Sequence, residues 1–316
     1  MLLSGRHELF RFSIFVIEYI QNMFMLFLCE KTLCFLSRGD SWVMYQIIKV
    51  LNNNAFLASY DDGERILLGK GIGFGKKAGD RFQTIKGARV FTLASKENEE
   101  SGLNVVKGID PVFLEAAGKI IEEAEEIFDS INPDILLPLA DHIAFAAKRE
   151  KEKIHIPNPF IADIKALFGR EYTVVLNCRD SVEKMTGYQI SDDEVGFIAL
   201  HIHSGLSDEH VTETLKITQT IDECLLMVEN MLKQTISRES LGGIRLMSHL
   251  YYMIDRIKTG EDINIELNEF VQKNYPKAWE VSRKVCLYVF EKMKAPISEK
   301  EVGFFAVHIQ TIVNIR

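Results

Sequence analysis

A tandem duplication in the second half of the chain constrains its fold more than any other feature. The segment EKMTGYQISDDEVGFIALHI at 183–202 recurs as EKMKAPISEKEVGFFAVHI at 291–309, one residue shorter near Pro296. Self-similarity of this kind predicts one structural module present twice.

The repeat brings two histidines into register. His142 and His249 lie 107 residues apart, as do His201 and His308, so 59 residues separate the two histidines within each copy. A lone helical histidine is more often a packing residue, but recurrence of the pair in both copies indicates a function. The other histidines lack a counterpart and are expected to serve packing or the surface: His7, His155, His203 and His210.

From about Leu103 onward the chain has the pattern of amphipathic helices. In 113–124, apolar residues recur at the 3.6-residue period, and prolines fall between such stretches. Together with the repeat, this pattern predicts two all-α helical-bundle domains, the first at 103–210 and the second at 211–316.

The segment 44–100 differs, with short apolar runs separated by turn residues. It predicts a small four-stranded antiparallel β domain, with strands at 47–51, 55–60, 65–68 and 88–93. From 44 to 92 there are eight Lys or Arg against four Asp or Glu, whereas the whole chain has a net charge of −8. A basic head on an acidic body indicates that the head alone meets a polyanion.

A glycine-lysine loop, GKGIGFGKKAGD at 69–80, lies between the third and fourth expected strands. It is no Walker loop, because Lys77 stands where Ser or Thr is required, and it fits GxGxxG in no register, so nucleotide chemistry is disfavoured. Its glycines allow the backbone to approach a polyanion, its lysines can contact phosphates, and Phe74 can stack on a base. A solvated hairpin loop is the alternative interpretation.

The run IIKVLNNNAFL at 47–57, followed by DDGERILLGKGIGFGKKAGD at 61–80, resembles the co-antiterminator domain of the BglG/SacY/LicT family of transcriptional antiterminators. The resemblance implies a four-stranded antiparallel sheet that dimerises and binds a partly mismatched RNA hairpin in a nascent transcript. It implies as first RNA contacts Lys49, Asn54, Gly69, Lys70 and Phe74, and as secondary ones Gly71, Lys76 and Lys77.

Paired histidines suit several chemistries. Metal binding is disfavoured because no carboxylate or cysteine recurs with them at ligand spacing. Nucleophilic catalysis needs a substrate pocket, which two helical copies do not obviously supply. Phosphate acceptance needs only an accessible neutral imidazole, and the product gains a dianionic group that can reorder an interface.

The helical copies resemble the paired phosphotransferase-system regulation domains of the same family. The resemblance rests on DHIAFA, NPF and DDEVGFIALHI in the first copy, and on SHLYYMIDRI and EKEVGFFAVHI in the second. It implies four phosphate acceptors, His142, His201, His249 and His308. Asp141 beside His142, where the second copy has Ser248, also follows the family pattern, and we expect it to orient the ring and to make the copies differ in donor preference.

The implied protein is a homodimeric antiterminator that is no enzyme and uses no cofactor or metal. It would hold a hairpin in leader mRNA and prevent terminator formation upstream of β-glucoside or sucrose utilisation genes. The expected donors are the sugar-specific permease component, acting on the first module to inhibit, and the general phosphocarrier protein, acting on the second to activate. The alternative is a DNA-binding transcriptional activator with the same modules, but 44–100 offers no helix-turn-helix.

Residues 1–43 fit this organisation poorly. The apolar run 9–29 is interrupted by Glu18, Gln21 and Asn22, and no small-residue cleavage site follows, so neither membrane anchor nor signal is expected. Because an organised pattern starts at Met44, we expect 1–43 to be a non-native extension. Five cysteines without a CxxC pair favour a reducing, cytoplasmic compartment.

Overall fold

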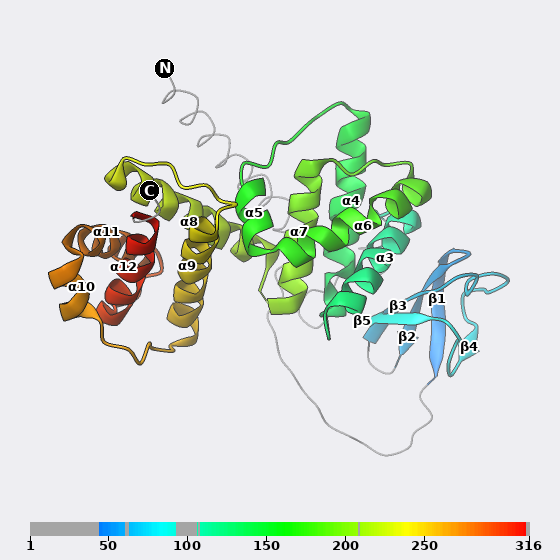
Figure 1. Cartoon of the computed structure of the whole chain (residues 1–316). Helices are drawn as coiled ribbons and strands as arrows, with labels where there is room; N and C mark the ends of the chain where they lie inside the picture. Colours follow the sequence, from blue (N-terminus) through cyan, green and yellow to red (C-terminus); the bar gives the residue numbers. More distant parts are fainter. Residues whose placement is uncertain (1–43, 61–62, 93–105, 107, 208, 314–316) are drawn as a thin grey trace, which may run out of the picture. The chain divides into compact units, whose positions relative to one another are not determined.

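The computed structural model describes residues 44–60, 63–92, 106, 108–207 and 209–313. Its N-terminal part is one antiparallel sheet with the strand order β4-β1-β2-β3-β5 (Figure 1). The strands are β1 (Tyr45–Asn52), β2 (Ala55–Tyr60), β3 (Gly63–Leu68), β4 (Arg81–Phe82) and β5 (Arg89–Thr92). The predicted strands correspond to β1, β2, β3 and β5. The structure adds β4, a two-residue edge strand that pairs with Tyr45 and Gln46 of β1.

Alternating apolar residues build the core of this head. A cluster of buried side chains from β1, β2, β3, β4 and the glycine-lysine loop comprises Ile47, Phe56, Ala58, Leu67, Ile72 and Phe82. The central strand β2 is buried along both faces at residues 55–58. The sheet therefore leaves its loops, rather than its middle, exposed for contacts.

Beyond the head, the described chain is helical, as predicted. The first stretch contains α3 (Pro111–Ile127), the 3₁₀ helix η1 (Pro133–Ile135), α4 (Leu136–Lys151), α5 (Ile161–Leu167), α6 (Gly169–Thr186) and α7 (Asp192–Ser207). Asp110 caps α3 by accepting a hydrogen bond from the backbone N–H of Val112, and proline occupies the first turn.

The second stretch repeats this pattern and begins with a long helix. It contains α8 (Val211–Leu232), α9 (Leu241–Thr259), α10 (Asn268–Asn274), α11 (Pro276–Lys292) and α12 (Glu299–Val313). Ser240 caps the start of α9, and Gly260 ends it in the left-handed conformation, with φ of 73°. Helices α9 and α12 lie side by side, as do α11 and α12 (Figure 1).

The chain forms two compact units, and their boundaries differ from those of the two sequence repeats. The first unit comprises the described residues up to Pro159 together with Arg170–Thr212, and the second comprises Phe160–Gly169 and the residues from Glu213 onward. Helix α5 therefore belongs to the second unit, although its position in the sequence matches that of α10 in the other copy, 107 residues later.

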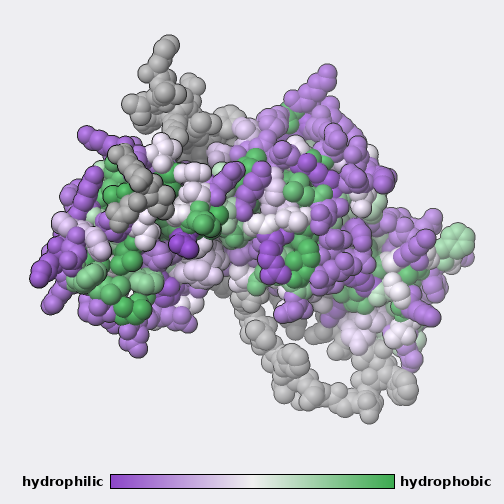
Figure 2. All heavy atoms as spheres, in the orientation of Figure 1, coloured by the Kyte–Doolittle hydropathy of each residue, from purple (hydrophilic) through white to green (hydrophobic). Residues whose placement is uncertain are grey.

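The surface in Figure 2 is dominated by hydrophilic side chains, with hydrophobic ones in scattered clusters. Among the described residues, none of the helices is long and apolar enough to cross a membrane. The apolar run 9–29 and the expected extension 1–43 lie outside the described residues.

Candidate RNA interface and paired histidine sites

The glycine-lysine loop is held by the asparagine turn between β1 and β2. Backbone hydrogen bonds run from Gly69 N to the Asn54 carbonyl and from Gly73 N to the Asn53 carbonyl, each at 2.9 Å. The side-chain oxygen of Asn54 accepts a third from Gly71 N at 2.8 Å. Asn54, Gly69 and Gly71, three predicted RNA contacts, thus form one hydrogen-bonded unit.

Two features of this loop require glycine. A Cβ on Gly73 would lie 2.2 Å from the Asn52 carbonyl oxygen, so any side chain would push the loop off the turn. Gly71 has a φ of 72°, which disfavours other residues. Between them Ile72 is buried in the core, while the adjacent Phe74 is 77% exposed. A large aromatic ring presented on an anchored loop is suited to stacking on an unpaired base.

The predicted basic contacts are all exposed. They are Lys49 on β1, Lys70 in the loop, and Lys76 and Lys77 after it. The segment that follows Lys77 runs along β1, because Ile47 accepts a hydrogen bond from Gly79 N at 2.7 Å and donates one to the Asp80 carbonyl at 2.9 Å. These exposed lysines can contact phosphates without desolvation of buried charge.

An acidic side chain of α3 occupies the asparagine turn. Glu115 accepts hydrogen bonds from Asn52 Nδ2 at 2.6 Å and from Asn54 Nδ2 at 2.9 Å. A second contact with α3 comes from β5, where Arg89 forms an ion pair with Glu125 at 2.6 Å. Both polar ends of the Asn54 amide are therefore engaged, one by the loop and one by Glu115. No pattern in the sequence pointed to Glu115.

The histidines paired by sequence spacing are neighbours in space. The rings of His142 on α4 and His201 on α7 lie 4.9 Å apart between centroids. Those of His249 on α9 and His308 on α12 lie 4.7 Å apart. Three of these side chains are buried, with His201 only 1% exposed, whereas His308 is partly exposed.

Each histidine pair contains a buried glutamate and an arginine that the sequence analysis missed. In the first copy, Glu194 bonds His142 Nε2 through Oε2 at 2.9 Å and accepts a hydrogen bond from Arg149 through Oε1. Arg149 follows His142 by seven residues on α4, and Glu194 precedes His201 by seven on α7. Residues seven apart share one face of a helix, so two facing helices contribute two residues each.

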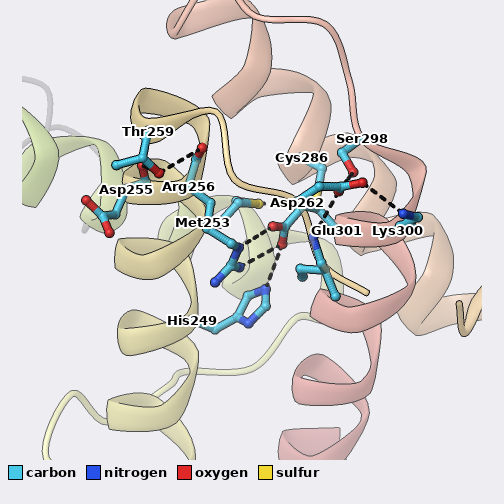
Figure 3. Close-up of polar contacts among 11 residues, drawn as sticks. His249, Met253, Asp255, Arg256, Thr259, Asp262, Cys286, Ser298, Lys300 and Glu301 are labelled. Carbon is cyan, nitrogen blue, oxygen red and sulfur yellow. Dashed lines mark hydrogen bonds and ion pairs between the residues drawn. The ribbon is translucent and has the colours of Figure 1, made fainter. Parts of the chain in front are cut away.

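The second copy has the same four residue types with a different bonding pattern (Figure 3). Arg256 donates to both oxygens of Glu301, through Nε at 2.7 Å and Nη2 at 3.0 Å. His249 Nε2 lies 3.6 Å from Glu301 Oε2, beyond a hydrogen bond. Glu301 and Arg256 follow Glu194 and Arg149 by the same 107 residues as the histidines do. That recurrence was the signal in the sequence.

Burial lowers the pKa of three of these histidines, His201, His249 and His308, and so favours their neutral form. Desolvation, followed by the proximity of His142, lowers the pKa of His201 well below its ordinary value. Desolvation, with His308 and Arg256 nearby, lowers the pKa of His249 to about 3. Desolvation also lowers the pKa of His308. A neutral ring retains the nitrogen lone pair that a nucleophile or phosphate acceptor requires.

The carboxylate in the first copy is held in its charged form. Burial alone would raise the pKa of Glu194, but the hydrogen bond from His142 and the positive charge of Arg149 outweigh it, and the pKa is lowered. Asp141 behaves differently, because desolvation raises its pKa against the opposing effect of His142. The His142 ring is hydrogen-bonded to Glu194, which accepts from Nε2, so the orienting role expected for Asp141 remains a prediction.

Among the described residues, no three or more His, Cys, Asp or Glu side chains are grouped so that they could hold a metal ion. Two of the histidines that lack a counterpart in the repeat contact carboxylates: His203 contacts Glu171 and His155 contacts Asp193, each at 3.0 Å.

Comparison with known proteins identifies both parts of this architecture. A family model described as the CAT RNA binding domain matches residues 45–100, and one described as the PRD domain matches residues 118–205 and again 222–312. An antiparallel head with an exposed glycine-lysine loop, followed by two histidine-bearing helical repeats, defines an RNA-binding regulator of modular construction.

Curated relatives match along nearly their whole length. "Protein GlcT" of Staphylococcus haemolyticus (strain JCSC1435) is 32% identical over 279 residues, which cover 85% of this chain and 96% of the relative. "Transcription antiterminator LicT" of Bacillus subtilis (strain 168) is 29% identical, covering 85% and 99%. "Crystal structure of GlcT CAT-PRDI" is 33% identical, covers 52% of this chain and 99% of that one, and has a TM-score of 0.46. The chain belongs to the BglG/SacY/LicT family of transcriptional antiterminators.

Proposed function

We propose that this chain is a cytoplasmic antiterminator that binds a hairpin in nascent leader mRNA and prevents terminator formation upstream of sugar-utilisation genes. The head binds RNA as part of a homodimer, and phosphorylation of the paired histidines controls whether it does so. The donors are the general phosphocarrier protein and the sugar-specific permease component of the phosphotransferase system. The choice of a β-glucoside or sucrose operon stays a prediction from the sequence.

The observation that carries the RNA assignment is the anchored loop. Asn54 fixes the backbone at Gly71, and the next turn of the loop presents Phe74 with 77% of its side chain in water. Exposing an aromatic ring is unfavourable unless it gains a partner, and bases of an unpaired RNA loop supply one. Exposed lysines beside it add contacts to phosphate.

The alternative of a DNA-binding activator finds no matching element. Residues 44–60 and 63–92 form strands and loops, and no helix-turn-helix occurs in these described ranges. The experiment that separates the two is selection by the full chain from two pools, one of randomised RNA hairpins and one of randomised duplex DNA. Enrichment from the RNA pool alone is expected. Enrichment from the DNA pool alone contradicts the proposal.

Substitutions then test the interface on the selected hairpin. Phe74→Ala should weaken binding about 5- to 150-fold, because stacking of one base on an aromatic side chain contributes about 1–3 kcal/mol. Phe270→Ala, at a 55% exposed phenylalanine of α10, is the matched control and should leave binding unchanged. Lys70→Ala should weaken binding and reduce its salt dependence by about one phosphate contact. Equal affinities in all four proteins would exclude this surface.

Phosphorylation control is tested by glutamine substitution at each paired histidine. At least one of His142, His201, His249 and His308 should change both phosphate uptake and antitermination of a reporter gene. Four silent variants would contradict the switch while leaving RNA binding by the head intact.

A further inference from the structure

The buried carboxylate beside the first histidine pair has a geometry that selects one ring nitrogen. His142 Nε2 and Glu194 Oε2 are 2.9 Å apart, and both side chains are more than nine-tenths buried. An ionised carboxylate only accepts hydrogen bonds, so a bond at this distance places a proton on Nε2. The ring is then the tautomer whose lone pair is on Nδ1.

Arg149 keeps the carboxylate in place. It donates to Glu194 Oε1 while His142 takes Oε2, so each oxygen has one partner. Arg149 is 7% exposed and its charge offsets that of Glu194, which removes the cost of an unpaired buried carboxylate. The carboxylate is therefore both charged and aimed at one atom of the ring.

We propose that Glu194 is a positioning residue that holds the ring proton of His142 on Nε2 and leaves Nδ1 as the atom that accepts the phosphoryl group. This inference rests on the proposed function, because it assigns the acceptor atom within a histidine that the switch uses. The donor is a phosphoprotein, or a small molecule, that carries the group on nitrogen or sulfur.

The step balances without transfer of a proton to or from the ring. The lone pair of Nδ1 forms the new N–P bond, and the bond between phosphorus and the donor breaks with its electron pair left on the donor atom. The ring keeps its Nε2 proton and becomes a phosphorylated imidazolium. The Glu194 carboxylate stabilises the positive charge that develops on the ring. Because it is hydrogen-bonded to the ring before the transfer begins, it does not have to reorient, as water would.

The second copy supplies the internal comparison. There Arg256 bonds both oxygens of Glu301, and His249 Nε2 lies 3.6 Å from the nearer one. Figure 3 marks the contact between His249 and Glu301, but its length exceeds that of a hydrogen bond, so it does not fix the ring proton of His249. Loss of the carboxylate should alter the acceptor atom in the first copy and not in the second.

The test reads the acceptor atom directly. Two full-length proteins are made, each retaining one of the four paired histidines, His142 or His249, with the other three replaced by glutamine. Each is phosphorylated by phosphoramidate and, separately, by the phosphorylated general phosphocarrier protein, then examined by two-dimensional ¹H–³¹P NMR at alkaline pH. Phosphate on Nδ1 couples only to the ring proton Hε1, whereas phosphate on Nε2 couples to both Hε1 and Hδ2.

We expect a single correlation, to Hε1, for His142. Glu194→Gln should introduce the pair of correlations from Nε2 and slow phosphorylation by about tenfold or more. Glu301→Gln in the protein that retains His249 is the matched control, and its product should keep the parental pattern. Circular dichroism establishes that the variants are folded. If Glu194→Gln does not fold, the pattern of the parent protein still decides.

Each other outcome has one meaning. Two correlations for His142 in the parent overturn the inference, as does an unchanged pattern and rate in folded Glu194→Gln, or failure of phosphoramidate to modify His142. Nδ1 phosphate from phosphoramidate, with no transfer from the phosphocarrier to any of the four histidines of the unsubstituted chain, supports the acceptor assignment but contradicts the phosphocarrier as a donor in the proposed function.

Discussion

Replacing His249 with glutamine should remove a specific pH dependence from the stability of the second unit. Burial, with His308 and Arg256 nearby, lowers the pKa of His249 to about 3, while an unfolded histidine titrates near 6.5. Between pH 6.5 and about 3, the His249 ring is therefore protonated in the unfolded chain and neutral in the folded chain. Stability from this group is fully present above pH 6.5 and is lost as the pH falls toward 3.

The magnitude follows from the interval between the two pKa values. Each unit of pH within it changes the free energy of unfolding by about 1.4 kcal/mol, so the loss between pH 7.5 and 4.5 approaches about 2.5 kcal/mol. The side chain is only 4% exposed, so solvent screening reduces this figure little. His249→Gln keeps a polar side chain of similar reach and cannot titrate.

Another group in the same unit acts in the opposite direction. Burial and the nearby Asp222 raise the pKa of Asp163 to about 7, against the effect of Arg238. The folded state therefore holds a proton that the unfolded state releases above pH 4, and this group adds stability as the pH falls from 7. The two contributions oppose each other in the unmodified protein, so only the difference between variants isolates each one.

The assay is urea unfolding followed by the fluorescence of Trp279, which packs against the core of the second unit. The other tryptophan, Trp42, is replaced by phenylalanine in all proteins. From pH 7.5 to 4.5 the parent should lose about 2.5 kcal/mol relative to His249→Gln, and should gain stability relative to Asp163→Asn. Parallel curves for the parent and His249→Gln would refute the claim that this ring is neutral because it is buried.

Three further outcomes are expected. Glu115→Gln removes the charge that holds the asparagine turn, so the full chain should bind the selected RNA hairpin a few-fold more tightly in a gel-shift titration; unchanged affinity would mean that the contact does not compete with RNA. Gly73→Ala should abolish RNA binding, because its Cβ would meet the Asn52 carbonyl oxygen at 2.2 Å, and a variant that binds normally would contradict this packing. His249 and His308 should not carry phosphate together, because two net negative charges about 5–7 Å apart repel by about 2–3 kcal/mol at an effective dielectric of about 20; intact-protein mass spectrometry that finds both modified in one molecule would disprove it.

The sheet of the head was largely predictable from sequence, and its edge was not. Alternating apolar residues and turn residues fix β1, β2, β3 and β5 locally, because each strand is long enough to show the pattern. Strand β4 has two residues, and it exists only because Arg81 and Phe82 pair with the start of β1. A strand defined by its partner rather than by its own pattern leaves no local signal.

The repeat singled out the four paired histidines, but it predicted neither that the rings of each pair are in contact nor which unit each helix joins. Helices α5 and α10 occupy equivalent positions in the two copies. However, α5 belongs to the second compact unit and not to the unit that contains most of its own copy. The two helices are equally long but differ in polarity, α5 being IADIKAL and α10 NEFVQKN. Which unit such a short helix joins depends on long-range packing. Glu194 and Glu301 lie in the repeated segments, each seven residues before a histidine. Because this spacing is not typical of metal ligands, no metal-ligand pattern drew attention to these carboxylates.

The duplication preserved residue types while changing how they are bonded, and we expect this difference to make the two copies unequal phosphate acceptors. Glu194 divides its oxygens between His142 and Arg149, whereas Glu301 gives both of its oxygens to Arg256. His201, the second ring of the first pair, is 1% exposed, so we expect a phosphoryl group to reach it only if α4 and α7 separate. His308, the second ring of the other pair, is partly exposed, so we expect a donor to reach it without that rearrangement. Under the proposed function, phosphorylation of His201 should therefore be coupled more strongly to helix movement than phosphorylation of His308.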